Sequence, residues 1–398
     1  MFEVIEGGLR ETAETSRKKL IAAYVTNTRL MGVVGVYASW FLPDNKLRDH
    51  LYQFFYLDAE EYGLDTYECV LGPDNEDTNS RVEEIKNRLM GGLGGELVEI
   101  DEQELAYLVK EYAEINKKNG DLLPTDNDAF NYILTLDSNL SKERIDELMD
   151  KECEEITSKY QAINYFLMRV FGKDLIAARY LTKGTFRINL FPDLPPSTLL
   201  RNEIDPVEQD YPKNFMCQSL LEVDDDYRLI ISQVTVENQK VTGFEKVSDF
   251  KVSVPEANLM TQRGEYITVF EYDALPETFD RRATMLTEKA QITKYDSGNL
   301  FMIFKPNNEH VDQKIFRLND DVLGTYFVTN AGEIILESYT EEGQKILEQD
   351  IIHGEIAMGL IPISKYFFSS PILFDFIQAG ELMFDEFVEI VSNPEITD

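Results

Sequence analysis

Between residues 215 and 340, short runs of β-branched and aromatic residues alternate with polar residues and are separated by turns. Runs bounded by Asp, Asn and Gly are typical of antiparallel hairpins. Cys217–Val223 and Tyr227–Val236, for example, flank the acidic turn Asp224–Asp226. The pattern therefore predicts a β-meander, with two further hairpins at Ala290–Tyr295 with Leu300–Phe304, and Gly324–Thr329 with Glu333–Glu337.

Residues 1–190 follow another pattern, with apolar residues three and four positions apart, as on one face of a helix. The stretch Leu30–Leu42 is uncharged, contains the only tryptophan, Trp40, and ends before Pro43. It is shorter than the roughly 20 apolar residues that a membrane-spanning helix requires. We therefore expect it to be a buried core helix. The other positions that define expected helices include Leu20, Tyr24, Leu47, Leu51, Phe54, Phe55, Val82, Ile85, Leu89, Leu105, Leu108 and Tyr112.

Five of the chain's 14 prolines lie between Pro192 and Pro212. Proline breaks helices and cannot donate to a sheet ladder. We therefore expect residues 191–214 to be a proline-rich connector between a mostly helical domain, residues 1–190, and a β-rich domain with terminal helices, residues 215–398. The expected fold class is α+β, a helical N-terminal domain followed by an antiparallel β-meander domain with C-terminal helices.

The C-terminal segment combines acidic and apolar residues. Ile356–Phe368 is strongly apolar and fits either a strand or a helix, and Tyr366–Asp398 contains seven acids and no Lys or Arg. Apolar residues there fall along one side of a helix. We expect Phe384 and Phe387 to pack on the protein's own body, because docking is what orders a terminal segment. The acids expected to face water are Asp385, Glu386 and Glu389.

The chain of 398 residues is strongly acidic, with 73 Asp and Glu against 38 Lys and Arg, which gives a net charge of -35. The expected N-terminal domain carries -13 and the remainder -22, so neither half is basic. Such a surface repels nucleic-acid phosphates and anionic membranes. Three scattered cysteines and an acidic N-terminus without a basic start favour a reducing, cytoplasmic location. We expect no direct nucleic-acid binding and no membrane association.

Candidate chemistry is sparse. The three histidines, His50, His310 and His353, lack a His or Cys at metal-ligand spacing. Cys69 and Cys217 are expected to behave as small buried hydrophobes. Cys153 lies between two glutamates, which raise a thiol pKa and oppose reactivity. The sequence therefore predicts no metal, no cofactor and no identifiable catalytic residue.

Three other features are candidates for a functional site. The cluster Gly91–Gly95 follows an expected helix and precedes the strand-like Leu97–Ile100, whereas a phosphate-binding glycine turn follows a strand and opens a helix. A helix C-cap with a connector is expected instead. The turn Asp224–Asp226 lacks the glycine and alternating ligands of a calcium loop. Tyr52 and Tyr56 fit either a ligand groove or the edge of a core.

These observations favour a non-catalytic, acidic, cytosolic interaction or accessory protein whose partner is a protein. One alternative is a hydrolase whose carboxylates converge in space, since the members of such a pair need not be close in sequence. A second alternative is an inhibitor that mimics nucleic acid. A cleft holding two acids with raised pKa values favours the enzyme, and a flat, exposed aromatic patch favours the interaction protein.

Overall fold

The structure, a computed structural model, describes residues 17–124, 129–184, 186–188, 194–208, 213–224, 226–272, 290–305, 309–353 and 360–392. The chain forms two compact units. Unit 1 comprises residues 1–257 and 308–318, and unit 2 comprises residues 258–307 and 319–398. No described helix combines the length and the hydrophobicity needed to cross a lipid bilayer.

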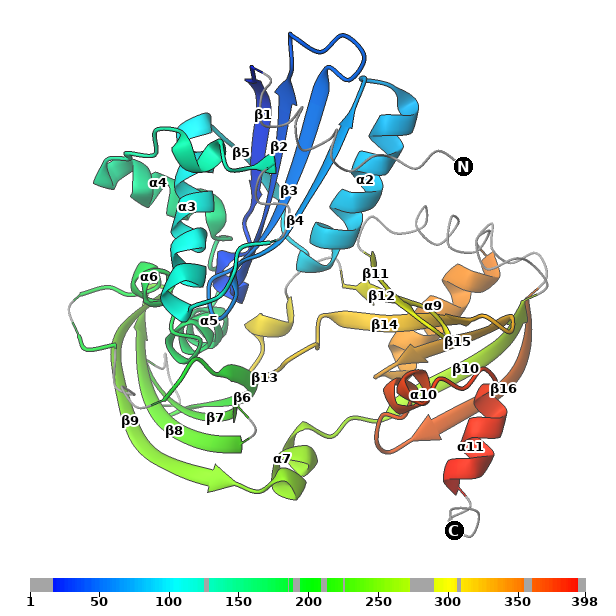
Figure 1. Ribbon diagram of the computed structural model, residues 1–398. Coiled ribbons are helices and arrows are strands. Elements are labelled where there is room, and N and C mark those ends of the chain that lie inside the picture. Colours follow the sequence, from blue (N-terminus) through cyan, green and yellow to red (C-terminus); the bar gives the residue numbers. More distant parts are fainter. Residues whose placement is uncertain are drawn as a thin grey trace. The chain divides into compact units, whose positions relative to one another are not determined.

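The first sheet of unit 1 is antiparallel, with strand order β4-β3-β2-β1-β5. Helix α2 covers one face and helix α3 the other (Figure 1). A short helix, η1, connects β1 to β2. The elements are β1 (Lys19–Thr26), η1 (Arg29–Met31), β2 (Val33–Phe41), β3 (His50–Asp58), β4 (Gly63–Gly72), α2 (Glu76–Met90), η2 (Gly91–Leu93), β5 (Leu97–Ile100), α3 (Glu102–Asn119), η4 (Ile133–Thr135) and α4 (Lys142–Glu152).

The predicted helical N-terminal domain is therefore wrong, because residues 19–72 form four strands. Burial of both faces of the sheet explains the error. Phe54 packs in the core beneath α2, whereas its neighbour Phe55 packs in the core beneath α3. Consecutive positions are then both apolar, and the alternation that identifies a half-buried strand disappears. Trp40 is 1% exposed, which confirms that this stretch is buried, although as strand β2 and not as a helix.

The second sheet of unit 1 has the order β13-β6-β7-β8-β9. Helix α5 packs in its core with every residue from Gln161 to Phe171 buried. Strand β6 lies within the proline-rich segment, and its only proline, Pro206, is its last residue. The elements are α5 (Lys159–Phe171), α6 (Leu175–Tyr180), β6 (Thr198–Pro206), β7 (Asn214–Val223), β8 (Asp226–Glu237), β9 (Lys240–Val252), α7 (Val254–Thr261), η5 (Glu309–Asp312) and β13 (Ile315–Arg317).

Unit 2 contains a six-stranded antiparallel sheet with the order β11-β12-β14-β15-β10-β16. Helix α9 packs on one face, and helices α10 and α11 pack on the other. The predicted hairpins β7–β8, β11–β12 and β14–β15 are confirmed. The elements are β10 (Glu265–Tyr272), β11 (Ala290–Tyr295), β12 (Gly298–Phe304), β14 (Val322–Thr329), β15 (Glu333–Ser338), α9 (Glu341–His353), β16 (Leu360–Phe368), α10 (Leu373–Ala379) and α11 (Phe384–Ser392).

The predicted docking of the C-terminal segment is also confirmed. Phe384 is fully buried and Phe387 is 7% exposed, both against the sheet of unit 2. Glu386 and Glu389 face water as expected. Asp385 is instead half-buried, because its carboxylate accepts hydrogen bonds from the hydroxyls of Ser364 and Tyr366.

Candidate functional site

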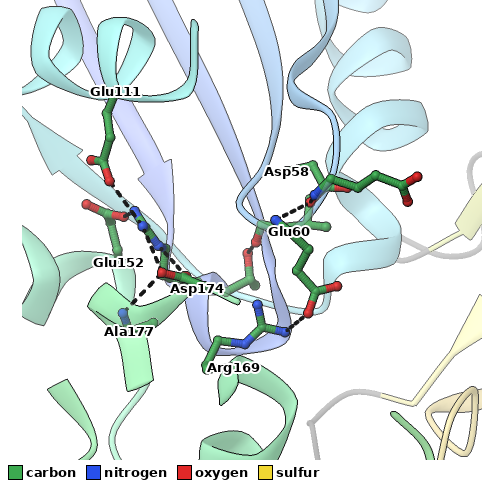
Figure 2. A network of polar contacts seen from close by, with 11 residues as sticks. Asp58, Glu60, Glu111, Glu152, Arg169, Asp174 and Ala177 are labelled. Carbon is green, nitrogen blue, oxygen red and sulfur yellow. Dashed lines mark hydrogen bonds and ion pairs between the residues drawn. The ribbon is translucent and has the colours of Figure 1, made fainter. Parts of the chain in front are cut away.

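In unit 1, a set of charged side chains surrounds Arg29, which is 1% exposed (Figure 2). Its Nε lies 3.0 Å from Asp174 Oδ2, and its Nη1 lies 3.0 Å from Glu152 Oε2. Its Nη2 lies 3.2 Å from Glu111 Oε1. The guanidinium also lies over the ring of Tyr112, 5.1 Å from the ring centroid. Every nitrogen of this guanidinium therefore has a carboxylate partner.

Arg29 and its three carboxylate partners come from four parts of the chain. Arg29 is in the short helix η1 between β1 and β2, Glu111 is on α3, and Glu152 ends α4. Asp174 is the N-cap of α6 and accepts a hydrogen bond from the Ala177 N–H at 3.2 Å. Since α6 packs in the core of the second sheet, the cluster joins that core to the first sheet and its helices. We name these four residues the Arg29 cluster.

One guanidinium faces three carboxylates in the Arg29 cluster, and the pKa values of two of them, Glu152 and Asp174, are shifted in opposite directions. Burial raises the pKa of Glu152 to about 7, against the opposing effect of Arg29. Burial would also raise the pKa of Asp174, but Arg29 and the hydrogen bonds outweigh it and hold this pKa below its usual value. A fully paired, buried arginine is costly to remove, because its carboxylate partners would be left unpaired. It is also not accessible to a substrate.

A second buried arginine lies beside the cluster (Figure 2). Arg169 of α5 is 1% exposed, and its Nη2 lies 2.9 Å from Glu60 Oε1 in the turn between β3 and β4. Its Nε and Nη1 have no hydrogen-bond partner among the described residues. Gly32 lies against this guanidinium with a φ of 101°, and a Cβ there would lie 2.8 Å from Nη1. Glycine is therefore required at position 32 both for its backbone conformation and for space.

Unit 2 brings together two buried acids, Glu265 of β10 and Glu337 of β15, each 2% exposed. Glu337 Oε2 accepts a hydrogen bond from the Thr325 hydroxyl at 2.8 Å, and its Oε1 has no partner among the described residues. Burial and, to a smaller extent, repulsion from Glu265 raise the pKa of Glu337 to about 8. Burial raises the pKa of Glu265 to about 7, although the Ile372 N–H donates to its Oε2 at 2.7 Å.

Glu265 and Glu337 have the raised pKa values expected of a catalytic pair, but their carboxyl groups are not accessible to solvent. Glu265 caps the first turn of α10, and Glu333, on the same face of the sheet, accepts a hydrogen bond from the Phe384 N–H of α11 at 2.9 Å. The carboxyl groups thus hold the two C-terminal helices on the sheet. At 2% exposure, neither carboxyl group of the pair is accessible to a solvent-borne substrate.

The residues considered from the sequence are dispersed. His50 lies on β3 with its Nδ1 2.9 Å from Asp49, and His310 is buried beside the ring of Phe316. His353 is the last residue of α9, and its side chain is not among those that the structure describes. Within the described ranges, no group of three or more His, Cys, Asp or Glu side chains is arranged to hold a metal ion.

Burial raises the thiol pKa of Cys153, and likewise that of Cys217. Cys69 is half-buried on β4. The predicted end of a helix at Gly91–Gly95 is confirmed, since α2 ends at Met90 and Gly94 is in the left-handed conformation.

The acidic turn between β7 and β8 is tied to strand β9, where Lys251 pairs with Asp226 at 2.6 Å. Asp225 lies outside the described residues. Tyr52 and Tyr56 lie on β3 and not on a helix, and Tyr52 belongs to the core beneath α2. The edge-of-core interpretation therefore holds for Tyr52.

The chain has no counterpart among the known proteins compared with it: no protein-family model, curated protein or solved structure matches it. Its function must therefore be argued from its own residues. Sequence reasoning missed the Arg29 cluster, whose only signal is an arginine directly before the uncharged stretch Leu30–Leu42. It also missed the acid pair, because Glu265 and Glu337 are adjacent only through the pairing of β10 with β15.

Proposed function

We propose that this protein is a non-catalytic interaction or accessory protein that binds a protein partner along strand β16. The observation that supports this is a row of exposed apolar side chains on β16. Ile361, Ile363 and Phe367 are 61%, 45% and 59% exposed. They are spaced along the strand, but a bulge at Ile363 interrupts the alternation, so Ile361 and Phe367 lie on opposite faces of the sheet. An exposed apolar row of this kind is typical of a protein-binding surface.

Strand β16 is also an edge strand. It pairs with β10 on one side, and no described strand pairs with its other side. Its outer N–H and C=O groups can therefore accept an added strand from a partner. Edge strands are usually protected by charges, prolines or bulges. Pro362 protects the start of β16, and the one charged side chain of the strand, Lys365, is paired with Glu348 at 2.7 Å. A bulge at Ile363 protects the edge further, so residues 364–368 remain its accessible part.

The charge of the chain indicates the chemistry of the partner. The net charge is -35, and residues 366–398 contain seven acids and no base. A basic partner is attracted by such a field, and the attraction accelerates association more than it tightens the complex. We therefore propose a partner with an extended, apolar segment flanked by Lys or Arg. The hydrolase and nucleic-acid-mimic alternatives stay predictions, and the buried acid pair does not give the hydrolase an accessible site.

A pull-down from native cytosol, followed by mass spectrometry, tests this proposal with the double variant Ile363→Asp/Phe367→Asp. The matched control is Leu47→Asp/Leu122→Asp, at two apolar positions of unit 1 that are 84% and 92% exposed. We expect at least one basic partner that the control retains and the β16 variant loses. Hydrogen exchange of residues 364–368 should slow in the complex.

Two results would contradict the proposal. One is capture of the same partners by the β16 variant and by the control. The other is a β16-dependent homodimer in light scattering, which would show that a second copy of the chain covers the strand. Circular dichroism of both variants distinguishes loss of binding from loss of fold.

A further inference from the structure

Unit 1 contains a pocket of about 460 Å³ beside helix α6. This volume lies within the range of roughly 300–1,000 Å³ that is usual for small-molecule sites. Helix α6 contributes two of the lining residues, and the segment that follows it contributes the others. The lining residues are Leu175, Arg179, Thr182, Gly184, Phe186, Arg187 and Ile188. Arg179, Thr182 and Arg187 are polar, and Leu175, Phe186 and Ile188 supply an apolar side.

The charge of this pocket is opposite to that of the chain. Residues 175–192 contain three basic residues and no acid, although the whole chain carries -35. Two of the three, Arg179 and Arg187, line the pocket. Both are exposed, and neither guanidinium has an ion pair or a hydrogen bond with a described residue. The nearby buried arginines Arg29 and Arg169, in contrast, have carboxylate partners.

An arginine near the end of a helix has an ordinary structural explanation, because it complements the helix dipole. That explanation covers Arg179, which lies in the last turn of α6. It does not cover Arg187, which lies beyond the end of the helix at Tyr180. The two side chains share a pocket and not a helix, which indicates a ligand that interacts with both.

We propose that this pocket binds a small organic phosphate monoester. The phosphate would lie between Arg179 and Arg187, and the organic group would lie against Phe186 and Ile188. Two guanidinium groups match the charge of a phosphate monoester, about -1.5 to -2 at pH 7. The planar donor fork of arginine fits phosphate oxygens in a bidentate manner. A single carboxylate would leave one arginine unneutralised, so the monoester is the better match.

Phenyl phosphate is the probe, and isothermal titration calorimetry with the full chain is the measurement. We expect one saturable site whose affinity falls with added salt, because the interaction is ionic. Arg179→Gln and Arg187→Gln should each weaken binding at least about tenfold, since each removes a charge-assisted contact. The matched control is Arg81→Gln on α2, which makes the same change of charge at another exposed arginine. It should bind within about twofold of the unchanged protein.

Inorganic phosphate and a phosphoserine peptide complete the experiment. Inorganic phosphate should bind at least about tenfold more weakly than phenyl phosphate, because it cannot use the apolar wall. Equal binding of the two would overturn the assignment of Phe186 and Ile188. Absence of saturable binding of phenyl phosphate, an equal loss in the Arg81→Gln control, or tighter binding of the peptide would overturn the proposal. The fluorescence of buried Trp40 reports whether each variant retains the fold of unit 1.

Discussion

The substitution Glu337→Gln should stabilise unit 2, and the gain should grow as pH rises. Glu337 is 2% exposed, and its Oε1 has no hydrogen-bond partner among the described residues. Its pKa is raised from 4.5 to about 8, first by burial and then by Glu265. The unfolded chain therefore loses this proton near pH 4.5, whereas the folded chain keeps it to about pH 8. Stability contributed by the neutral acid is complete below pH 4.5 and declines as pH rises towards 8.

The size of the effect follows from the two pKa values. Glutamine keeps the shape of the neutral acid, can accept from the Thr325 hydroxyl and does not ionise. The free energy of unfolding should then exceed that of the unchanged protein by about 1 kcal/mol at pH 5, about 3 kcal/mol at pH 7 and about 5 kcal/mol at pH 9. These values are upper bounds, because an ionised Glu337 can relax towards water or towards Arg263, which lowers its pKa.

The measurement must report on unit 2. Trp40 and all three cysteines belong to unit 1, so tryptophan fluorescence and thiol labelling do not follow the sheet that contains Glu337. We therefore measure unfolding in urea with a hydrogen-exchange pulse. Mass spectrometry of peptides from β10 and β15 then reports on the sheet of unit 2. Glu381→Gln, at an exposed position of unit 2, controls for the change of net charge. A gain that is the same at every pH, or a loss of stability at pH 9, would refute the reasoning.

Four further outcomes are expected. Arg29→Leu should cost about 3–5 kcal/mol of unit 1 stability in urea at pH 8, because three carboxylates lose their cation, and a cost under about 1 kcal/mol would show that Arg29 is not costly to remove. Trp40→Ala should cost about 3–5 kcal/mol, measured by circular dichroism, and a much smaller loss would contradict its burial. Deletion of residues 371–398 should lower the melting temperature and expose dye-binding surface, whereas unchanged melting with loss of a partner would make the segment a recognition element. A brief protease digest should cut the expected connector at residues 191–197 or 207–214 before it cuts β6, since strand pairing protects a backbone, and a first cut within 198–206 would contradict this.

The sequence predicted those parts of the fold where one local pattern decides the structure. The hairpins β11–β12 and β14–β15 have short turns that contain glycine or asparagine, and such turns fix the pairing of neighbouring strands. The docking of Phe384 and Phe387 followed from an apolar stripe on an acidic helix. The first sheet of unit 1 could not be predicted in the same way. Helices cover both of its faces, so adjacent residues such as Phe54 and Phe55 are both buried and their spacing resembles that of a helix.

The buried charge clusters could not be predicted, because their members meet only through the folded chain. Arg29 and Asp174 are 145 positions apart. With 73 acids in the chain, the presence of any one acid predicts almost nothing about its role. Burial separates the few that matter, since a buried carboxyl must find a partner, keep its proton or lose stability. Asp174 has a cationic partner and a lowered pKa, whereas Glu337 keeps its proton. Glu152, with a pKa of about 7, is intermediate between these two cases.

Both proposed binding surfaces are local departures from the average composition of the chain. The apolar row on β16 occurs in a segment whose strand or helix character the sequence left open, and pairing with β10 makes it an exposed edge. The pocket with Arg179 and Arg187 lies in an acid-free stretch of an acidic chain. Because the two surfaces belong to different units, a substitution in one should leave the other intact. Phenyl phosphate should therefore bind the Ile363→Asp/Phe367→Asp variant as it binds the unchanged protein, and a loss of both activities in that variant would indicate a general loss of fold.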